Sequence, residues 1–186
     1  MVRFIVNGAP VEAEGGGSLL SWLREVAHLT AAKNACGEGV CGACSVLVDG
    51  ALLTSCTLPM ERMAGRNIVT VEGIPRPELD LYANAFADSG AVQCGFCTPG
   101  MVLAAKALLD RNPRPTEAET RAALRRNICR CTGYAKIVQG ILLAAARKRG
   151  EGDTESTGRP TAASAAGIGA RLRRVDAVAK ARGEAA

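Results

Sequence analysis

Cysteine is the residue type whose spacing in this sequence most directly indicates chemistry. The eight cysteines make up about one residue in 23, which is too sparse for a small secreted scaffold held together by disulfides. Thiols that stay reduced are more often metal ligands or reactive groups. They divide into a first set and a second set of four: Cys36, Cys41, Cys44 and Cys56, then Cys94, Cys97, Cys129 and Cys131.

The first set has the spacing C-x4-C-x2-C, and its fourth cysteine follows after eleven further residues. This is the spacing of plant-type ferredoxins, in which four thiolates hold a 2Fe–2S cluster. Gly37, Gly39 and Gly42 would let the loop wrap a compact inorganic core and direct backbone N–H groups at the sulfurs. Zinc and purely structural thiols are the alternatives, but zinc sites prefer two facing C-x2-C pairs. The first set therefore predicts a 2Fe–2S site.

The second set is a C-x2-C pair followed, after 31 residues, by a C-x-C pair. A helix is expected directly after each pair, one capped by Thr98 with Pro99 in its first turn and one beginning at Tyr134. The partial positive charge and free N–H groups of two helix N-termini favour an anionic thiolate site. The spacing alone predicts a metal site, with iron–sulfur favoured and zinc left open.

Composition and charge narrow the class of protein. Apolar residues make up 48% of the 186 residues, enough for a packed core, and no apolar run is long enough to span a bilayer. The net charge of +5 counts every thiol as neutral; two filled 2Fe–2S sites would each remove about two charges and leave about +1. Nucleic-acid binding is therefore not indicated. The single histidine, His28, leaves little scope for a catalytic triad, and a protein of the reducing cytoplasm is expected.

The pattern of apolar and turn residues over 1–73 predicts a small mixed sheet with one helix packed on it. The helix is expected at 18–28, with Ser18 as its N-cap. Asn7-Gly8 and Asp49-Gly50 predict two hairpin turns, the second of which would bring Cys56 back to the cysteine loop. The expected strands are 2–6, 11–14, 45–48, 51–54 and 68–71.

Beyond this region the pattern becomes helical, so the fold class is α+β. Residues 73–77 are expected to be a linker because they contain two prolines. A second domain over 78–149 is expected to hold four helices. Residues 150–186 contain few large apolar side chains and are expected to form a mobile extension, with a short helix around 170–182. The helices of the second domain are predicted at 78–89, 99–111, 117–126 and 134–149.

Three stretches of sequence resemble the signatures of one known family. Residues 93–100 read Gln-Cys-Gly-Phe-Cys-Thr-Pro-Gly, and residues 127–134 read Asn-Ile-Cys-Arg-Cys-Thr-Gly-Tyr. Together with residues 36–44 they resemble the xanthine dehydrogenase, or molybdenum hydroxylase, family. The resemblance covers residues 1–149, and it is to the separate small iron–sulfur subunit of the three-subunit bacterial members.

The resemblance implies a β-grasp ferredoxin domain over 1–73 and a four-helix bundle over 78–149. It implies one 2Fe–2S cluster in each, held by the eight cysteines named above. It further implies that the second cluster lies beside a molybdopterin cofactor on a large subunit, and that Gln93 and Cys131 contact that pterin. FAD is expected on a medium subunit. The chain itself would have no catalytic residue and no organic substrate.

The expected role is to pass electrons singly from molybdenum through the second cluster and then the first to the flavin. A free-standing ferredoxin-type carrier is the alternative function, although such a carrier has little need of a helical cluster domain. A zinc-binding interaction module is a third possibility. The substrate class is left open among purines, aldehydes, carbon monoxide and N-heterocycles.

Overall fold

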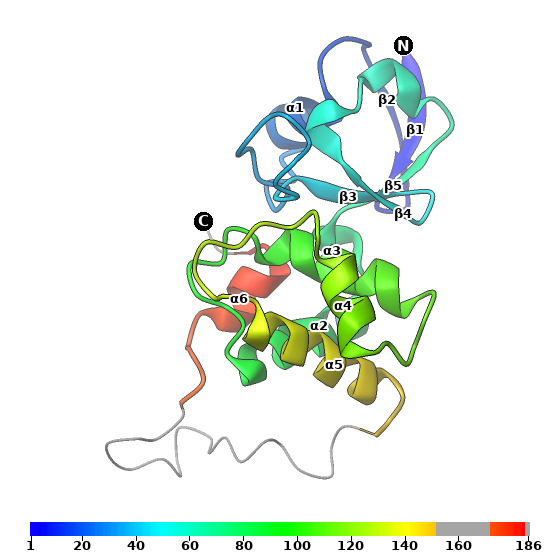
Figure 1. Ribbon diagram of the computed structural model, residues 1–186. Coiled ribbons are helices and arrows are strands. Elements are labelled where there is room, and N and C mark those ends of the chain that lie inside the picture. The colour runs from blue at the N-terminus through cyan, green and yellow to red at the C-terminus, as the bar shows by residue number, and fades with distance from the viewer. Residues whose placement is uncertain (152–171, 185–186) are drawn as a thin grey trace.

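The computed structural model describes residues 1–151 and 172–184 and has an α+β fold. Figure 1 shows two parts, a sheet with a short helix at the top and a group of helices below it. We call them the sheet unit (residues 1–73) and the helical unit (residues 76–151 with 172–184). No helix in the described ranges is both long enough and apolar enough to cross a membrane.

The five strands of the sheet lie in the order β2-β1-β5-β3-β4. β1 and β5 are parallel, and the other neighbouring strands are antiparallel. The predicted strands are present, but β2 covers 9–13 instead of 11–14, and the last strand covers 67–69 instead of 68–71 because residues 71–73 form a turn of 3-10 helix. The strands are β1 (Val2–Val6), β2 (Ala9–Ala13), β3 (Ser45–Val48), β4 (Ala51–Thr54) and β5 (Asn67–Val69).

Two tight turns form the hairpins that the sequence predicts. Asn7 and Gly8 have φ angles of 51° and 83°, and Asp49 and Gly50 have φ angles of 49° and 81°. Two successive residues with positive φ are typical of the hairpin turn whose twist matches that of the strands. The Asp49 carboxylate also accepts a hydrogen bond from the backbone N–H of Asn67 at 2.9 Å, which ties the second hairpin to β5.

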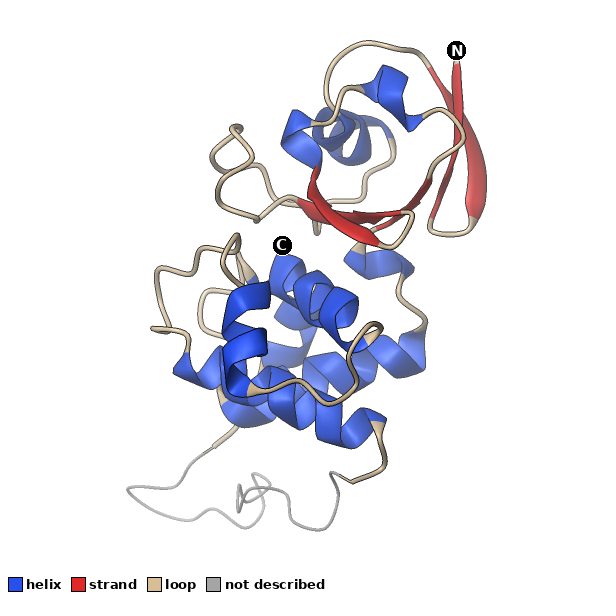
Figure 2. Ribbon diagram, turned by 45° about the vertical axis from the view of Figure 1, so that its right-hand side comes forward, coloured by secondary structure: helices blue, strands red, loops and turns tan. Residues whose placement is uncertain are grey.

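The helix of the sheet unit begins where the sequence predicts it. The Ser18 hydroxyl accepts a hydrogen bond from the N–H of Ser21, and the helix runs as α1 (Leu19–Ser21) and continues as a π-helical turn (Trp22–Val26). Leu23 is fully buried in the core of the sheet unit. Figure 2 shows this helix lying across one face of the sheet.

The four predicted helices of the helical unit are all present. α2 begins inside the predicted linker, because Pro77 occupies its first turn, where a missing N–H does no harm. Cys97 rather than Thr98 is the N-cap of α3, and the predicted capping box of Thr116 and Glu119 is formed at the start of α4. The helices are α2 (Arg76–Ser89), α3 (Thr98–Leu109), α4 (Glu117–Ala123), α5 (Ala135–Lys148) and α6 (Ala177–Arg182).

Strand β3 joins the two units because it is buried on both faces. Val46 and Val48 belong to the core of the sheet unit, whereas Leu47 belongs to the core of the helical unit. Successive side chains of a strand point to opposite faces of the sheet, so β3 has one apolar face for each unit. The two units therefore pack directly on each other, with the helices beneath the sheet in Figure 1.

The C-terminal segment is folded where the structure describes it. α6 lies against α2 and α3, and Ala177 and Ala181, four residues apart on one face of α6, are 1% and 0% exposed. The expectation of a mobile extension over 150–186 therefore does not hold for residues 172–184, because small side chains let this helix pack closely. The rest of the predicted extension, residues 152–171 and 185–186, lies outside the described residues.

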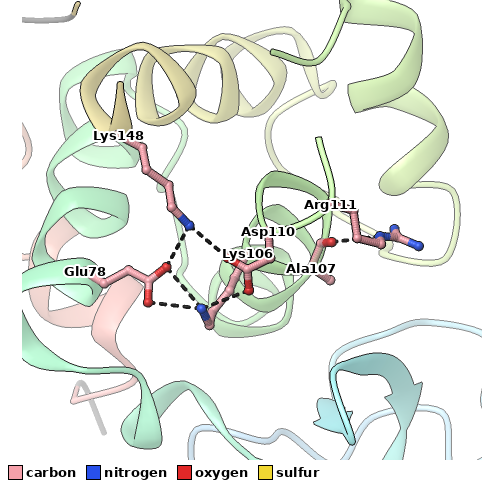
Figure 3. Close-up of polar contacts among 6 residues, drawn as sticks. All are labelled: Glu78, Lys106, Ala107, Asp110, Arg111 and Lys148. Carbon is pink, nitrogen blue, oxygen red and sulfur yellow. Dashed lines mark hydrogen bonds and ion pairs between the residues drawn. The ribbon is translucent and has the colours of Figure 1, made fainter. Parts of the chain in front are cut away.

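A network of ion pairs connects three helices of the helical unit (Figure 3). The Lys106 ammonium group on α3 donates to both carboxylate oxygens of Glu78 on α2 and to Asp110, each at 3.0 Å. Lys148 on α5 donates to Glu78 at 3.0 Å and to Asp110 at 2.8 Å. Partial burial alone would raise the pKa of Asp110, but the hydrogen bonds from Lys148 and Lys106 outweigh it and lower that pKa.

Asp110→Asn is expected to reduce the stability of the protein at neutral pH but not in acid. Because the folded-state pKa of Asp110 is lowered, its contribution is fully present above its unfolded pKa of about 4 and is lost as the pH falls through the folded value. The expected loss is about 0.5–1 kcal/mol, since solvent screens a partly exposed carboxylate. Denaturant unfolding at several pH values measures it. Glu117→Gln, which breaks an exposed pair with Arg121, is the control; an equal loss there would contradict a special role for the network.

Candidate metal centres

The structure brings the four thiols of the first set together in two pairs. The Cys41 thiol lies within hydrogen-bonding reach of Cys36, and the Cys44 thiol within reach of Cys56. The backbone N–H groups of Glu38, Cys41 and Val40 point at the Cys36 sulfur and, with the Cys41 thiol, lower the pKa of Cys36 to about 6. The loop that carries these thiols therefore favours the thiolate form of Cys36.

Burial has the opposite effect at the other pair of the first set. It raises the pKa of Cys56 to about 11, together with the neighbouring Cys44 thiol, while the backbone N–H of Gly39 acts to lower it. Cys44 is almost fully buried. A thiolate at this pair needs a positive charge close by, such as a metal ion, to compensate for the loss of water.

Glycine is required at Gly39 and Gly42 of this loop for steric reasons. Both have positive φ, 77° and 68°. A Cβ atom on Gly39 would lie 2.9 Å from the methyl group of Thr57, and one on Gly42 would overlap the carbonyl oxygen of Arg126 in the helical unit. The predicted role of the glycines, to let the backbone approach closely, thus applies to packing around the loop as well.

The second set is also assembled in two pairs. The sulfurs of Cys94 and Cys131 are 3.6 Å apart, and the Cys129 thiol lies within hydrogen-bonding reach of Cys97. Burial, with the nearby Cys129, raises the pKa of Cys97 to about 12. Burial also acts to raise the pKa of Cys129, but the hydroxyl of Thr132, which donates to its sulfur at 3.1 Å, and backbone N–H groups lower it overall.

The second set has an open side and a covered side. Cys94 and Cys131 are exposed, whereas Cys97 and Cys129 are partly buried. The Gln93 side chain is also exposed, beside Cys94 in the sequence, and its backbone carbonyl accepts a hydrogen bond from the α6 residue Lys180 at 3.2 Å. The two residues expected to contact a pterin, Gln93 and Cys131, therefore both lie at the surface.

Tyr134 holds the C-x-C loop in its bent shape. The φ angle of Tyr134 is 71°, and its hydroxyl accepts a hydrogen bond from the N–H of Cys129 at 2.9 Å and donates to the carbonyl oxygen of Asn127 at 3.0 Å. α5 begins at the next residue. The sequence pattern indicates Tyr134 only as the start of this helix, so its role in fixing the loop was missed.

The two sets are joined by hydrogen bonds between their loops. The N–H of Ile128 donates to the carbonyl oxygen of Cys41 at 2.9 Å, and the Asn127 side-chain amide donates to the carbonyl oxygen of Gly42 at 3.2 Å. Asn127 is 2% exposed. Because Ile128 precedes Cys129, a path of one hydrogen bond and about ten covalent bonds connects the Cys41 thiol of the first set to the Cys129 thiol of the second.

The arrangement of the thiols in pairs differs from that of a site in which several ligands surround one metal ion. Within residues 1–151 and 172–184, no three Cys, His, Asp or Glu side chains lie close enough together to ligate a single metal ion. All eight cysteines are free thiols, with no disulfide among them. Four thiols in two pairs fit a core of two irons, in which each iron takes two thiolates.

The comparisons with known proteins agree with this geometry. The family described as "2Fe-2S iron-sulfur cluster binding domain" matches residues 6–81, and the family "2Fe-2S binding domain" matches residues 70–142. The nicotinate dehydrogenase small FeS subunit of Eubacterium barkeri is 46% identical over 130 residues, which are 69% of this chain and 83% of that protein. The xanthine dehydrogenase iron-sulfur-binding subunit of Escherichia coli O157:H7 is 43% identical over 146 residues, 76% of this chain and 91% of that protein.

The chain belongs to the family of small iron–sulfur subunits of xanthine dehydrogenase type. Among solved structures, the aldehyde oxidoreductase of Desulfovibrio desulfuricans superimposes with a TM-score of 0.89 at 38% identity. That match covers 100% of this chain but only 21% of the longer enzyme. The iron–sulfur family thus includes both separate small chains and segments of large ones, and the match to the large one extends over the C-terminal segment of this chain.

Proposed function

We propose that this chain is the electron-transfer subunit of a molybdenum hydroxylase and holds one 2Fe–2S cluster in each of its two cysteine sets. The observation that carries the proposal is that each set of four thiols forms two pairs, as two irons require. A zinc ion would instead draw all four sulfurs of a set around one point. The eight cysteines of the first and second sets are the proposed ligands.

In finer detail, we propose that the sheet unit is a β-grasp ferredoxin domain and that α2 to α5 form a four-helix bundle. The sheet order, with its parallel β1 and β5 and a helix across one face, supports the first. The packing of α5 against both α2 and α4 supports the second. α6 adds a fifth, short helix to the bundle.

The hydrogen bond between Ile128 and Cys41 supports electron transfer between the two sites. When bound, 2Fe–2S clusters supply one-electron carriers. The chain holds its two cysteine loops against each other through the Ile128 N–H, which donates to Cys41, and the Asn127 amide, which donates to Gly42. Asn127 is 2% exposed, so its amide makes this contact away from solvent.

The exposed side of the second set is the proposed contact with a large subunit that carries a molybdopterin cofactor. Cys94, Cys131 and Gln93 lie there, and the neighbouring apolar side chains of Phe96 and Ile128 are 45% and 54% exposed. Exposed apolar side chains around a functional site favour a protein partner. Electrons would then leave through the first set to an FAD subunit, and eight reduced thiols suit a cytoplasmic location.

Metal analysis tests the proposal directly. Chain purified without oxygen is expected to contain about four iron and about four acid-labile sulfide per molecule, with visible absorption. A colourless protein with stoichiometric zinc would contradict the iron–sulfur assignment. Purification from the native host is expected to recover chains that carry molybdenum and flavin. Recovery of an iron-loaded chain without them would instead favour the free-standing ferredoxin.

A further inference from the structure

The C-terminal segment 172–184 returns to the loop that carries the first pair of the second set. Gly95, between Cys94 and Cys97, has a φ angle of 90°, and a Cβ atom on it would lie 2.7 Å from the Cγ and Cδ atoms of Lys180. The aliphatic part of Lys180 therefore lies directly on Gly95. Its ammonium group continues past the loop and donates to the carbonyl oxygen of Gln93 at 3.2 Å.

A second cation of the same segment lies near the open side of the second set. Asp176, through a hydrogen bond and its charge, is the main cause that raises the pKa of Arg174, and the nearby Cys94 contributes to the same shift. Asp176 also pairs with Lys180 at 2.8 Å. Because one carboxylate faces two cations, this group of three side chains has a net charge of +1 beside the cysteine loop.

The segment is held firmly enough to fix the position of these charges. Ala181 is fully buried, and Gly183 packs against Ala31 and Val71 of the sheet unit. Arg182 pairs with Asp80 of α2 at 2.7 Å. α6, labelled in Figure 1, therefore ends where the sheet unit and the helical unit meet, and the Lys180 side chain is only 16% exposed.

We propose that residues 172–184 place fixed positive charge beside the second site and that Lys180 is a positioning residue that raises the reduction potential of its cluster. The inference rests on the proposed function, since it needs a cluster at the second set. A one-electron reduction adds a negative charge to a site that four thiolates already make anionic, so a fixed cation nearby stabilises the reduced form. One electron enters from the molybdenum side and one leaves to the first cluster, and no bond forms or breaks.

The charged segment thereby makes the second site a better acceptor of electrons from the partner subunit. It acts in two ways, through the charge of Lys180 and through the hydrogen bond that fixes the Gln93 carbonyl next to Cys94. Nearby charge and hydrogen bonding are the main means by which a protein sets a cluster potential. No sequence pattern indicates this role, because Lys180 is 49 residues beyond the last cysteine.

A redox titration of the full, iron-loaded chain, followed by EPR, tests the inference. Lys180→Met keeps a side chain of similar length on Gly95 but removes the charge. At the midpoint potential of the wild-type second cluster, the ratio of reduced to oxidised cluster is expected to fall about tenfold, which is about 59 mV for one electron. The midpoint potential of the first cluster should not change. Lys180→Arg keeps the charge and is expected to restore most of the ratio.

Arg182→Met is the matched control, because it removes a charge from the same helix on the side that faces Asp80. Equal midpoint potentials in wild type and Lys180→Met, or equal shifts in Lys180→Arg and Lys180→Met, would overturn the inference while leaving the proposed function intact. If Lys180→Met loses its second cluster, Arg174→Gln, at a half-exposed position, replaces it as the test. The ratio of reduced to oxidised second cluster should then fall by less than tenfold, and an unchanged ratio would overturn the inference. A wild-type chain without iron would overturn both proposals.

Discussion

Cys129→Ser is expected to remove the second cluster and to stop electron flow from substrate to acceptor, while the first cluster still assembles. A serine hydroxyl keeps its proton at neutral pH and is a poor iron ligand, whereas thiolates are the ligands that hold these clusters. Cys129 is also the thiol next to Ile128, whose N–H donates to the carbonyl oxygen of Cys41. The variant therefore removes a ligand of the second cluster, and that ligand is the thiol next to the hydrogen bond between the two cysteine loops.

The loss is expected to stay local because the two sets are supported by separate cores. Cys44 lies in the core of the sheet unit and Cys56 packs against it, whereas Cys97 and Cys129 pack against the core of the helical unit. The iron content should fall from about four to about two per chain, and one of two sets of EPR signals should disappear.

Cys36→Ser is the reciprocal control for this experiment. It should remove the other set of EPR signals and leave the second cluster, which identifies the signals of each site. Disappearance of both clusters in either variant would show that the sites do not assemble independently. The division of the eight cysteines into two sets of four would then be wrong.

Local features of the sequence were enough to predict most of the fold. The two hairpins follow from Asn7-Gly8 and Asp49-Gly50, whose positive φ angles need residues of this kind. The cap at Ser18 and the capping box at Thr116 each depend on residues within three positions. Interactions of this kind depend on residues that are close together in the sequence, so a sequence pattern can predict them.

The cysteine sets could be predicted for a different reason. The spacing along the chain separates the thiols of residues 36–56 from those of residues 94–131, and the structure brings thiols within each group together. Their role as metal ligands stays a prediction. The pairing within each set, Cys36 with Cys41 and Cys94 with Cys131, could not be derived from spacing, since it depends on how the loops fold. The resemblance to a known family indicated which residues form each site, but it did not indicate the hydrogen bonds between the two cysteine loops.

Contacts between segments that are far apart in the sequence could not be predicted from sequence patterns. Ile128 contacts Cys41 through backbone atoms. Nearly every residue type has the same backbone groups, so the residue types at these positions do not indicate the contact. The docking of α6 depends on Ala177 and Ala181, which are as common in loose segments as in packed helices. The predicted short helix around 170–182 is present as α6 (Ala177–Arg182), but the prediction of a mobile extension was wrong for residues 172–184, because a low content of large apolar side chains does not prevent close packing.

Gly42→Ala is expected to destabilise the protein strongly and to slow electron transfer between the clusters. Gly42 has a φ angle of 68°, a conformation in which a residue with a Cβ atom costs about 1–2 kcal/mol. The new Cβ atom would also overlap the carbonyl oxygen of Arg126 and would lie 2.7 Å from the side-chain nitrogen of Asn127. Overpacking of this kind costs about 1–3 kcal/mol, so a loss of about 2–5 kcal/mol in the free energy of unfolding is expected.

The loop can relieve the overlap only by moving away from the helical unit. That movement would lengthen the hydrogen bonds from Asn127 to Gly42 and from Ile128 to Cys41, which hold the two sites together. With both clusters present, transfer from the second to the first is expected to slow about tenfold or more, because small displacements have large effects on reactions that depend on position. Rapid-freeze EPR after a limited pulse of reductant measures this rate.

Gly37→Ala separates backbone strain from the contact between the units. Gly37 lies in the same loop with a φ angle of 71°, but nothing lies within 4 Å of a Cβ atom placed there. Its expected loss is therefore only the backbone part, about 1–2 kcal/mol, with no change in the transfer rate. If the two variants were equally stable and transferred electrons equally fast, the packing of Gly42 against the helical unit could not be what keeps the two sites in contact.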